Sequence, residues 1–94
     1  MLFVVHCIDK PGHADVRTAN RQAHLDHLRA QGDGVVLAGP LLAEDGGGMA
    51  GSLLVLDFAD RAATETFLRD DPYARAGLFE SVALHPFRQV LPEG

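Results

Sequence analysis

The stretch LFVVHCI, residues 2–8, decides the fold of this chain. It is rich in β-branched residues and runs into the turn sequence DKPG at residues 9–12, a pattern typical of a β-strand. Side chains alternate along a strand, so Phe3, Val5 and Cys7 share one face and the other four positions share the opposite face. Both faces are mostly apolar. The stretch therefore predicts a sheet that is covered on both sides.

The rest of the chain supplies the other elements of this sheet. The pattern predicts a helix over residues 16–31, with Asp15 as its N-cap and Gly32 after its end, and a second helix over 61–69 capped by Asp60. It predicts strands over 35–42 and 51–58 and a last strand over 78–90, which Pro86 interrupts. This βαββαβ order is that of the ferredoxin-like fold. We expect one α+β domain over residues 1–94, with two helices on one face of a four-stranded antiparallel sheet.

Composition narrows the range of functions. The chain has 94 residues, of which 47% are hydrophobic and 22% charged, and its net charge is −5. Its basic residues are scattered, so we expect no nucleic-acid partner. Its apolar runs are too short for a membrane helix, and its beginning lacks the features of a signal peptide. The single cysteine, Cys7, cannot form an internal disulfide, which favours a reduced, cytoplasmic setting.

A second copy of the chain is the expected partner. The segments 35–42 and 51–58 repeat the pattern of the first strand, with apolar side chains on both faces. Two helices can cover only one face of the sheet, and an apolar patch of this size is not left in water. We therefore expect a homodimer that packs sheet against sheet.

The first helix carries polar residues on its core-facing side. On a helical wheel, Leu25 and Leu28 mark that side, and Arg21 and His24 fall beside them. A buried charge without a partner is costly. Either the two polar side chains flank a cavity and meet a carboxylate, or Arg21 extends to solvent at the edge of the core and His24 is an ordinary hydrogen-bonded core residue.

The segment DDPYARAG, residues 70–77, offers the missing carboxylate. In a ferredoxin-like fold the chain that follows the second helix lies beside the first helix. Pro72 forbids ordinary helix continuation and fixes a turn. We expect Asp70 to be solvated and Asp71 to turn inward to His24, with Tyr73 forming one wall of the site.

Several segments together resemble the YciI-like family. They are RQAHLDHL (21–28), LAGPL (37–41), GSLLVLDF (51–58), DDPYARAG (70–77) and HPF (85–87). The resemblance implies a ferredoxin-like fold that dimerises as an α/β barrel, with a His–Asp pair in a small cleft. Carried over to this chain, the pair is His24 and Asp71. The positions that match residues around the cleft are Arg21, Gly39, Pro40, Ser52 and Tyr73.

The resemblance also suggests a chemistry. A related enzyme removes chloride from a chlorinated hydroxyhydroquinone, and the fold is shared with muconolactone-type isomerases. A carboxylate bound to one imidazole nitrogen fixes the tautomer, so that the other nitrogen can take a proton. Arg21 would then hold an anionic oxygen, and Ser52 or Tyr73 would donate a further hydrogen bond. This set suits elimination or isomerisation of a small oxygenated ring.

Two alternatives stay open at this stage. The same cleft could bind a small anionic or phenolic metabolite without chemistry, as part of a regulatory dimer. His24 and His27 lie one turn apart and could share a metal, but the sequence places no third ligand beside them. We therefore expect a small-molecule ligand and neither a metal nor a cofactor.

Overall fold

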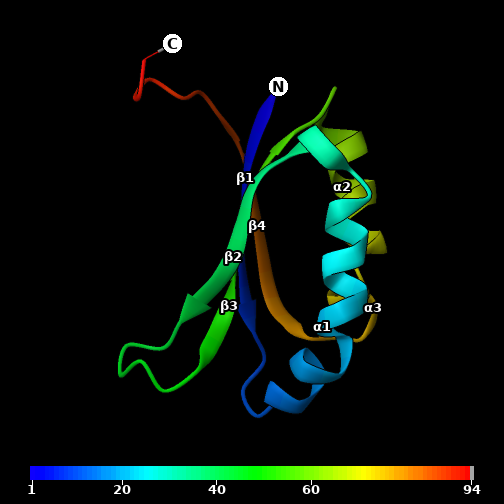
Figure 1. The fold of residues 1–94 in the computed structure, drawn as a ribbon, viewed down its shortest axis with the longest axis vertical. Helices are drawn as coiled ribbons and strands as arrows, with labels where there is room; N and C mark the ends of the chain where they lie inside the picture. Colours follow the sequence, from blue (N-terminus) through cyan, green and yellow to red (C-terminus); the bar gives the residue numbers. More distant parts are fainter. Residues whose placement is uncertain (94) are drawn as a thin grey trace.

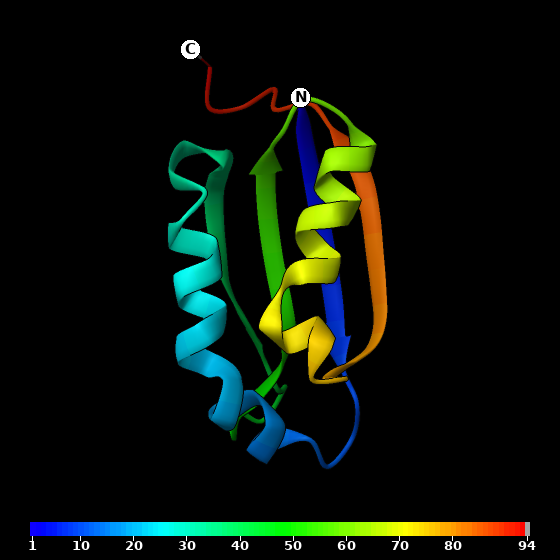
Figure 2. The ribbon, with the colours of Figure 1, turned by 90° about the vertical axis from the view of Figure 1, so that its right-hand side faces the viewer.

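The order of helices and strands confirms the ferredoxin-like α+β fold expected from the sequence. The computed structural model describes residues 1–93. Its elements are β1 (Leu2–Asp9), α1 (Ala14–Arg29), a 3₁₀ turn (Gly32–Gly34), β2 (Val35–Leu42), β3 (Met49–Asp57), α2 (Arg61–Asp70), α3 (Pro72–Arg75) and β4 (Phe79–Phe87). The four strands form one antiparallel sheet in the order β2-β3-β1-β4, and the helices lie on one face of it (Figures 1 and 2).

Strand register separates the two faces of the sheet. On the helix-covered face, Leu54 of β3 pairs with Val5 of β1 and with Ala38 of β2. The core between this face and the helices contains six buried apolar side chains, namely Val5, Cys7, Leu28, Leu54, Leu56 and Phe67. Alternation along each strand sends the neighbouring residues to the opposite face.

The start of α1 and the end of β4 differ from the bounds predicted from the sequence, and hydrogen bonding explains both differences. Helix α1 begins at Ala14, two residues earlier than Asp15 as N-cap would allow. The N-cap is His13, whose carbonyl accepts hydrogen bonds from the amides of Val16 and Arg17. Strand β4 ends at Phe87 rather than at residue 90, because its partner β1 begins at Leu2 and offers no further pairing.

Pro86 does not interrupt the last strand. It lies inside β4 and pairs with Phe3. Because β4 is an edge strand, one side of it has no neighbouring strand, and a residue that lacks an amide hydrogen can be tolerated there. Pro86 is therefore consistent with β4 being an edge strand of the sheet, and it does not end the strand.

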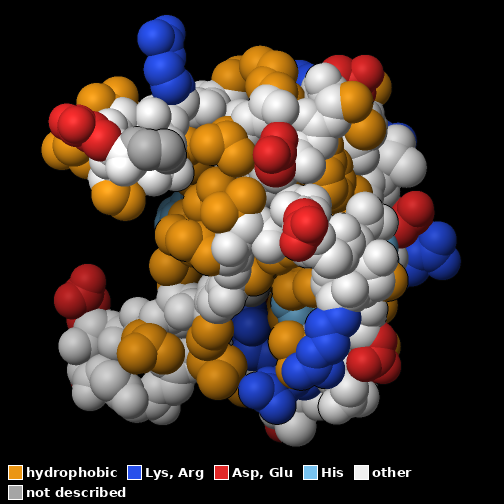
Figure 3. All heavy atoms as spheres, turned by 45° about the horizontal axis from the view of Figure 1, so that its top comes forward, with side chains coloured by type: hydrophobic (Ala, Val, Ile, Leu, Met, Phe, Trp, Pro, Cys, Tyr) orange, Lys and Arg blue, Asp and Glu red, His pale blue; other side chains and the backbone are white. Residues whose placement is uncertain are grey.

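The face of the sheet opposite the helices is apolar and open. Leu37, Val55, Val4 and His85 form one row across the four strands of this face. No helix among the described residues packs on it, and Leu37 is 52% exposed. Figure 3 shows hydrophobic side chains gathered in a recess on this side of the molecule, at the left. Across residues 1–93, none of the helices has the length and apolarity needed to span a membrane.

Gly51 allows β1 and β3 to approach each other beside the first helix. A Cβ atom at this position would overlap the backbone carbonyl oxygen of Cys7. Gly51 itself is buried, and its own carbonyl accepts a hydrogen bond of 2.8 Å from Nη2 of Arg17. Any side chain here would have to move backbone atoms and not merely a flexible side chain.

We predict that Gly51→Ala destabilises the fold by roughly 1–3 kcal/mol, since the added methyl group must displace a paired strand. Urea unfolding followed by circular dichroism measures the change. Gly39→Ala is the matched control, because Gly39 also lies in a strand and a Cβ there meets nothing within 4 Å. Equal losses in the two variants would contradict the steric argument.

Candidate functional site

One face of α1 carries the polar side chains of the candidate site. Arg17, Arg21, His24 and Leu28 follow one another at spacings of four, three and four residues, which aligns them on one side of a helix. Arg17, His24 and Leu28 are buried, whereas Arg21 is exposed. The wheel thus identified the correct face, but the buried guanidinium is that of Arg17 and not that of Arg21.

His24 meets the carboxylate of Asp71 from across the helical layer. Its Nδ1 lies 2.8 Å from Oδ1 and 3.0 Å from Oδ2 of Asp71, and both side chains are buried. Asp71 is the N-cap of α3, and its Oδ1 also accepts a 2.9 Å hydrogen bond from the amide of Tyr73. Pro72 occupies the first position of this short helix, where a missing amide hydrogen costs nothing. Local chain geometry therefore aims the carboxylate at α1.

Asp70, its neighbour, lies on the other side of the chain. It is exposed and ends α2, and its Oδ1 lies 3.4 Å from Nη2 of Arg75. The two consecutive acids of the DDPY sequence therefore have different surroundings, one in solvent and one in the protein interior.

Tyr73 forms the wall beside the pair. Its ring stacks on the His24 imidazole at a centroid distance of 3.9 Å, and its edge meets Phe79. The side chain is only 2% exposed. Burial raises the pKa of the Tyr73 phenol above its usual value, although the charges of Arg17 and Arg21 oppose this rise. The hydroxyl is therefore protonated near neutral pH and able to donate a hydrogen bond.

Arg17 is the residue that the sequence reasoning missed. Its Nε and Nη2 bind the two carboxylate oxygens of Asp9 at 2.8 and 2.9 Å. Nη2 also donates to the carbonyl of Gly51 and to Oγ of Ser52. Burial by itself lowers the pKa of the guanidinium, but the hydrogen bonds and charge of Asp9 more than offset this effect and the net pKa is raised. Arg17 is therefore a permanently charged group inside the protein.

A sequence signal for Arg17 did exist. It lies seven residues before His24, which is two helical turns and hence on the same face. Asp9 is the last residue of β1, at the end of the sheet where α1 begins. Leu25 and Leu28, which mark the core-facing side, both lie in the second half of the helix, and the prediction considered only the polar residues near them.

A cavity of about 250 Å³ lies between α1 and the β2–β3 part of the sheet. Six of the residues proposed from the sequence line it, namely Arg21, His24, Gly39, Pro40, Ser52 and Tyr73. Arg17 lines it as well, and Leu25, Leu28 and Leu54 supply an apolar wall. Asp71 is not among the residues that line the cavity, and it contacts the lining through His24. The volume is below the range of about 300–1,000 Å³ typical of sites for drug-sized molecules, which favours a small ligand.

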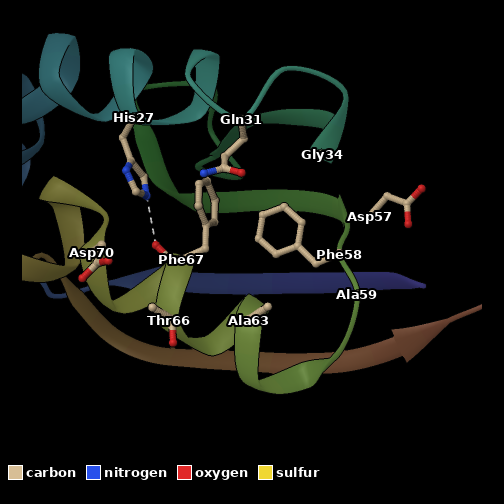
Figure 4. A pocket seen from close by; sticks show the side chains of 10 residues that line it. All are labelled: His27, Gln31, Gly34, Asp57, Phe58, Ala59, Ala63, Thr66, Phe67 and Asp70. Carbon is tan, nitrogen blue, oxygen red and sulfur yellow. Dashed lines mark hydrogen bonds between the residues drawn. The ribbon is translucent and has the colours of Figure 1, made fainter.

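His27 belongs to a different part of the surface. Its Nε2 lies 2.9 Å from the backbone carbonyl of Phe67, and its ring stacks on the Phe67 ring in a shallow groove between α1 and α2 (Figure 4). The two histidines of α1 therefore do not converge on one point. Among residues 1–93, no three His, Cys, Asp or Glu side chains are grouped so that they could hold a metal ion.

Comparison with known sequences places these residues in a family. The family model described as YCII-related domain matches residues 1–88. Protein YciI of Escherichia coli O6:H1 is 33% identical over 97 aligned residues, which cover 96% of this chain and 99% of that protein. The resemblance that the sequence motifs suggested is thereby confirmed.

Comparison with solved structures extends the similarity to an enzyme. One similar structure is that of 5-chloro-2-hydroxyhydroquinone dehydrochlorinase from Burkholderia phenoliruptrix AC1100, in complex with 2,5-dihydroxybenzoquinone. Its sequence is 30% identical to this chain, and the two structures superpose with a TM-score of 0.86 over 94% of each chain. SnoaB of Streptomyces nogalater, a cofactor-independent oxygenase, is 19% identical with a TM-score of 0.57, over 98% of this chain and 96% of that one. The second similarity concerns the fold alone.

Cys7 is expected to be unreactive in the folded protein. Burial raises the pKa of its thiol from 9.0 to about 12, and the charges of Asp71 and Asp9 add to the rise. At pH 8, iodoacetamide should label Cys7 only after denaturation, as mass spectrometry would show. Labelling of the native protein at the rate of a free thiol would contradict this expectation.

The same raised pKa predicts how stability depends on pH. The folded state keeps a neutral thiol where the unfolded chain ionises, so this contribution to the free energy of unfolding is complete below 9.0 and falls as the pH rises towards about 12. Denaturant melts across this range measure the slope. Cys7→Ala is the control, since it should remove the part of the slope that the thiol causes.

Proposed function

The chain belongs to the YCII-related domain family, and from this premise we propose that it is a small-molecule enzyme in which His24 and Asp71 act as a general acid–base pair. The reaction is an elimination, such as dehydrochlorination, or an isomerisation of a small oxygenated ring. The similarity to a dehydrochlorinase over nearly the whole chain supports this class of chemistry.

The observation that carries the proposal is the position of His24 between a carboxylate and a cavity. Within residues 1–93, every fully enclosed side-chain nitrogen or oxygen has a hydrogen-bond partner. Nδ1 of His24 is bound to Asp71, whereas Nε2 makes no hydrogen bond to these residues. Nε2 is therefore not enclosed, and His24 lines the cavity. Asp71 fixes the tautomer that leaves Nε2 free to accept a proton.

The proposed step follows from this arrangement. Nε2 of His24 takes a proton from a hydroxyl or an acidic carbon of the ring, and the released electron pair forms a new double bond. In an elimination, the leaving group departs with the electrons of its own bond, as chloride would. In an isomerisation, the imidazolium returns the proton to another carbon. Neither route needs an oxidant or a reductant.

The surroundings of the pair fit an anionic or phenolic ligand. Arg21 lies at the exposed part of the cavity lining, and the hydroxyl groups of Ser52 and Tyr73 belong to the same lining. Gly39 and Pro40 contribute the β2 side of the cavity without bulk or charge. Cationic and hydroxyl groups of this kind stabilise an oxyanion that develops when a phenol or enol loses its proton.

We predict that His24→Gln and Asp71→Asn each lower kcat by roughly 10²–10⁴-fold, the usual contribution of a positioned acid–base group. Asn can still cap α3 through its side-chain oxygen, so the fold should be kept. The assay is chloride release from 5-chloro-2-hydroxyhydroquinone, followed by a wider panel of phenolic acids and lactones. His27→Gln is the control, because His27 faces the other groove.

Full activity in both variants would remove the pair from the mechanism. Ligands that raise the melting temperature of the wild-type protein but yield no product would instead support a non-catalytic, metabolite-binding module. The two functions therefore separate on product analysis of the same set of compounds.

The apolar open face supports a homodimer packed sheet against sheet. Leu37, Val55 and Val4 occupy one row of this face, and the helices lie on the other side of the sheet. Leu37 is exposed and Val55 and Val4 are half-buried, and a contiguous apolar surface across several strands is unusual for a monomer. A two-fold axis would bury the same row of both copies at once.

We predict that the wild-type protein is a dimer at micromolar concentration and that Leu37→Glu makes it monomeric, since each interface would then contain buried carboxylates. Light scattering coupled to size exclusion measures the mass. Val82→Glu is the matched control: Val82 is 47% exposed, similar to Leu37, but it pairs with Cys7 and so belongs to the helix-covered face. A monomeric wild-type protein would contradict the prediction.

A further inference from the structure

The chain continues beyond its last strand as a tail. Residues 88–93 follow β4 without forming a helix or a strand, and every one of them is exposed. Within residues 1–93, the one side-chain hydrogen bond of this tail joins Nε2 of Gln89 to the carbonyl oxygen of Pro92, and so it stays inside the tail. Side-chain hydrogen bonds therefore do not tie residues 88–93 to the sheet or to the helices.

Two large apolar side chains stand in the middle of this tail. Val90 is 72% exposed and Leu91 is 71% exposed, so neither packs on the sheet of its own chain. A single exposed hydrophobic residue is ordinary on a protein surface, but these two are adjacent. Phe87, three residues before Val90, is itself exposed at the end of the open apolar face, where it pairs with Leu2. The tail thus continues the apolar surface of that face beyond the last strand.

The tail leaves the sheet on the side opposite the helices. Figure 1 shows it, in brown and red, rising from the end of β4 away from α1 and α2. An extended chain spans about 3.3 Å per residue, so Val90 can lie about 10 Å from Phe87. Two sheets that pack face to face are also about 10 Å apart. Val90 and Leu91 can therefore reach the level at which the sheet of a second copy would lie.

We propose that residues 88–93 form an arm that packs on a second copy of this chain, with Val90 and Leu91 buried against the open apolar face of the other copy. The inference rests on the proposed homodimer, and it adds to the sheet-to-sheet contact a segment that lies outside the sheet. Under two-fold symmetry each copy supplies one arm and receives one, so the contact is made twice in each dimer.

The open face is suited to receive these side chains. Strand pairing places Leu37 and Leu53 on it, on the two strands farthest from the origin of the arm. Among residues 1–93, the strand register gives this face one formally charged residue, Asp57, and the ammonium group of Met1 lies 2.8 Å from its carboxylate. An apolar arm would therefore meet no unpaired charge there.

A second copy accounts for both exposed surfaces at once. The arm and the open face belong to the same chain, so one symmetric interface covers both without any further partner. Burial of apolar area is the driving force for such an association. A different protein would have to supply an apolar face for the arm and a second apolar surface for the sheet.

The energetic test compares two valines that are exposed in the single chain. Val90→Glu should raise the dissociation constant of the dimer by roughly 10- to 100-fold, because two unpaired carboxylates would be buried in each dimer. Val82→Glu is the matched control, since Val82 is 47% exposed but belongs to the helix-covered face, and it should leave the constant unchanged. Analytical ultracentrifugation over a range of concentrations measures the constants, and thermal melts followed by circular dichroism check that both variants fold.

A cross-linking test locates the arm directly. Leu91→Cys provides one reactive thiol, because Cys7 is buried, and a benzophenone maleimide attached to it reacts with its neighbours under ultraviolet light. Mixing this protein with isotope-enriched wild-type protein yields dimers with one chain of each kind. Mass spectrometry should find residue 91 joined to the enriched chain at positions on its open face, such as Leu37 or Leu53.

The outcomes separate the arm from the dimer itself. A dimeric sample in which the cross-links stay within the labelled chain, or fall on the helices of the enriched chain, would overturn the arm. An unchanged dissociation constant in Val90→Glu would do the same, and the sheet-to-sheet dimer would stand. A monomeric wild-type protein would remove the dimer and the arm together.

Discussion

The carboxylate of Asp71 is the group on which both the fold and the site depend. It accepts a hydrogen bond from the Tyr73 amide and lies 2.8 Å from Nδ1 of His24, so it joins the start of α3 to the middle of α1. These contacts satisfy the polar oxygens of a side chain whose residue is only 2% exposed. The short helix thus holds the acid before any ligand arrives.

A second carboxylate, that of Asp9, is also held by hydrogen bonds, at the other end of the site. Asp9 is bound through both oxygens by Arg17, and Arg17 in turn ties β1 to the first residues of β3 through Gly51 and Ser52. Removing one member of such a buried pair leaves an uncompensated charge, which costs several kcal/mol, about 3–5. The polar groups of the site are therefore part of what holds helix to sheet, and their positions are set by folding and not by ligand binding.

Much of this arrangement could be predicted from the sequence. The parts that could not be predicted depend on contacts between distant segments of the chain. Alternation in LFVVHCI and the order of elements were enough for the fold, since strand and helix patterns act locally. Pro72 after two acids was enough to suggest a turn next to α1. Arg17 was not found, because its burial depends in part on the carbonyl of Gly51 and the hydroxyl of Ser52, which lie 34 and 35 residues away in sequence and meet it only in the folded sheet.

Strand β3 links the cavity to the open face of the sheet. Its alternation sends Ser52 and Leu54 to the cavity and sends Leu53 and Val55 to the exposed apolar side. A slip of one residue in its register would exchange these two sets, placing leucine beside Arg17 and serine on the apolar face. Gly51 permits the close approach to Cys7, and its carbonyl accepts a hydrogen bond from Arg17. It therefore specifies the register of β3 next to the cavity, where a slip would change the lining. The geometry of the site and the surface available for association are therefore set by the same strand pairing.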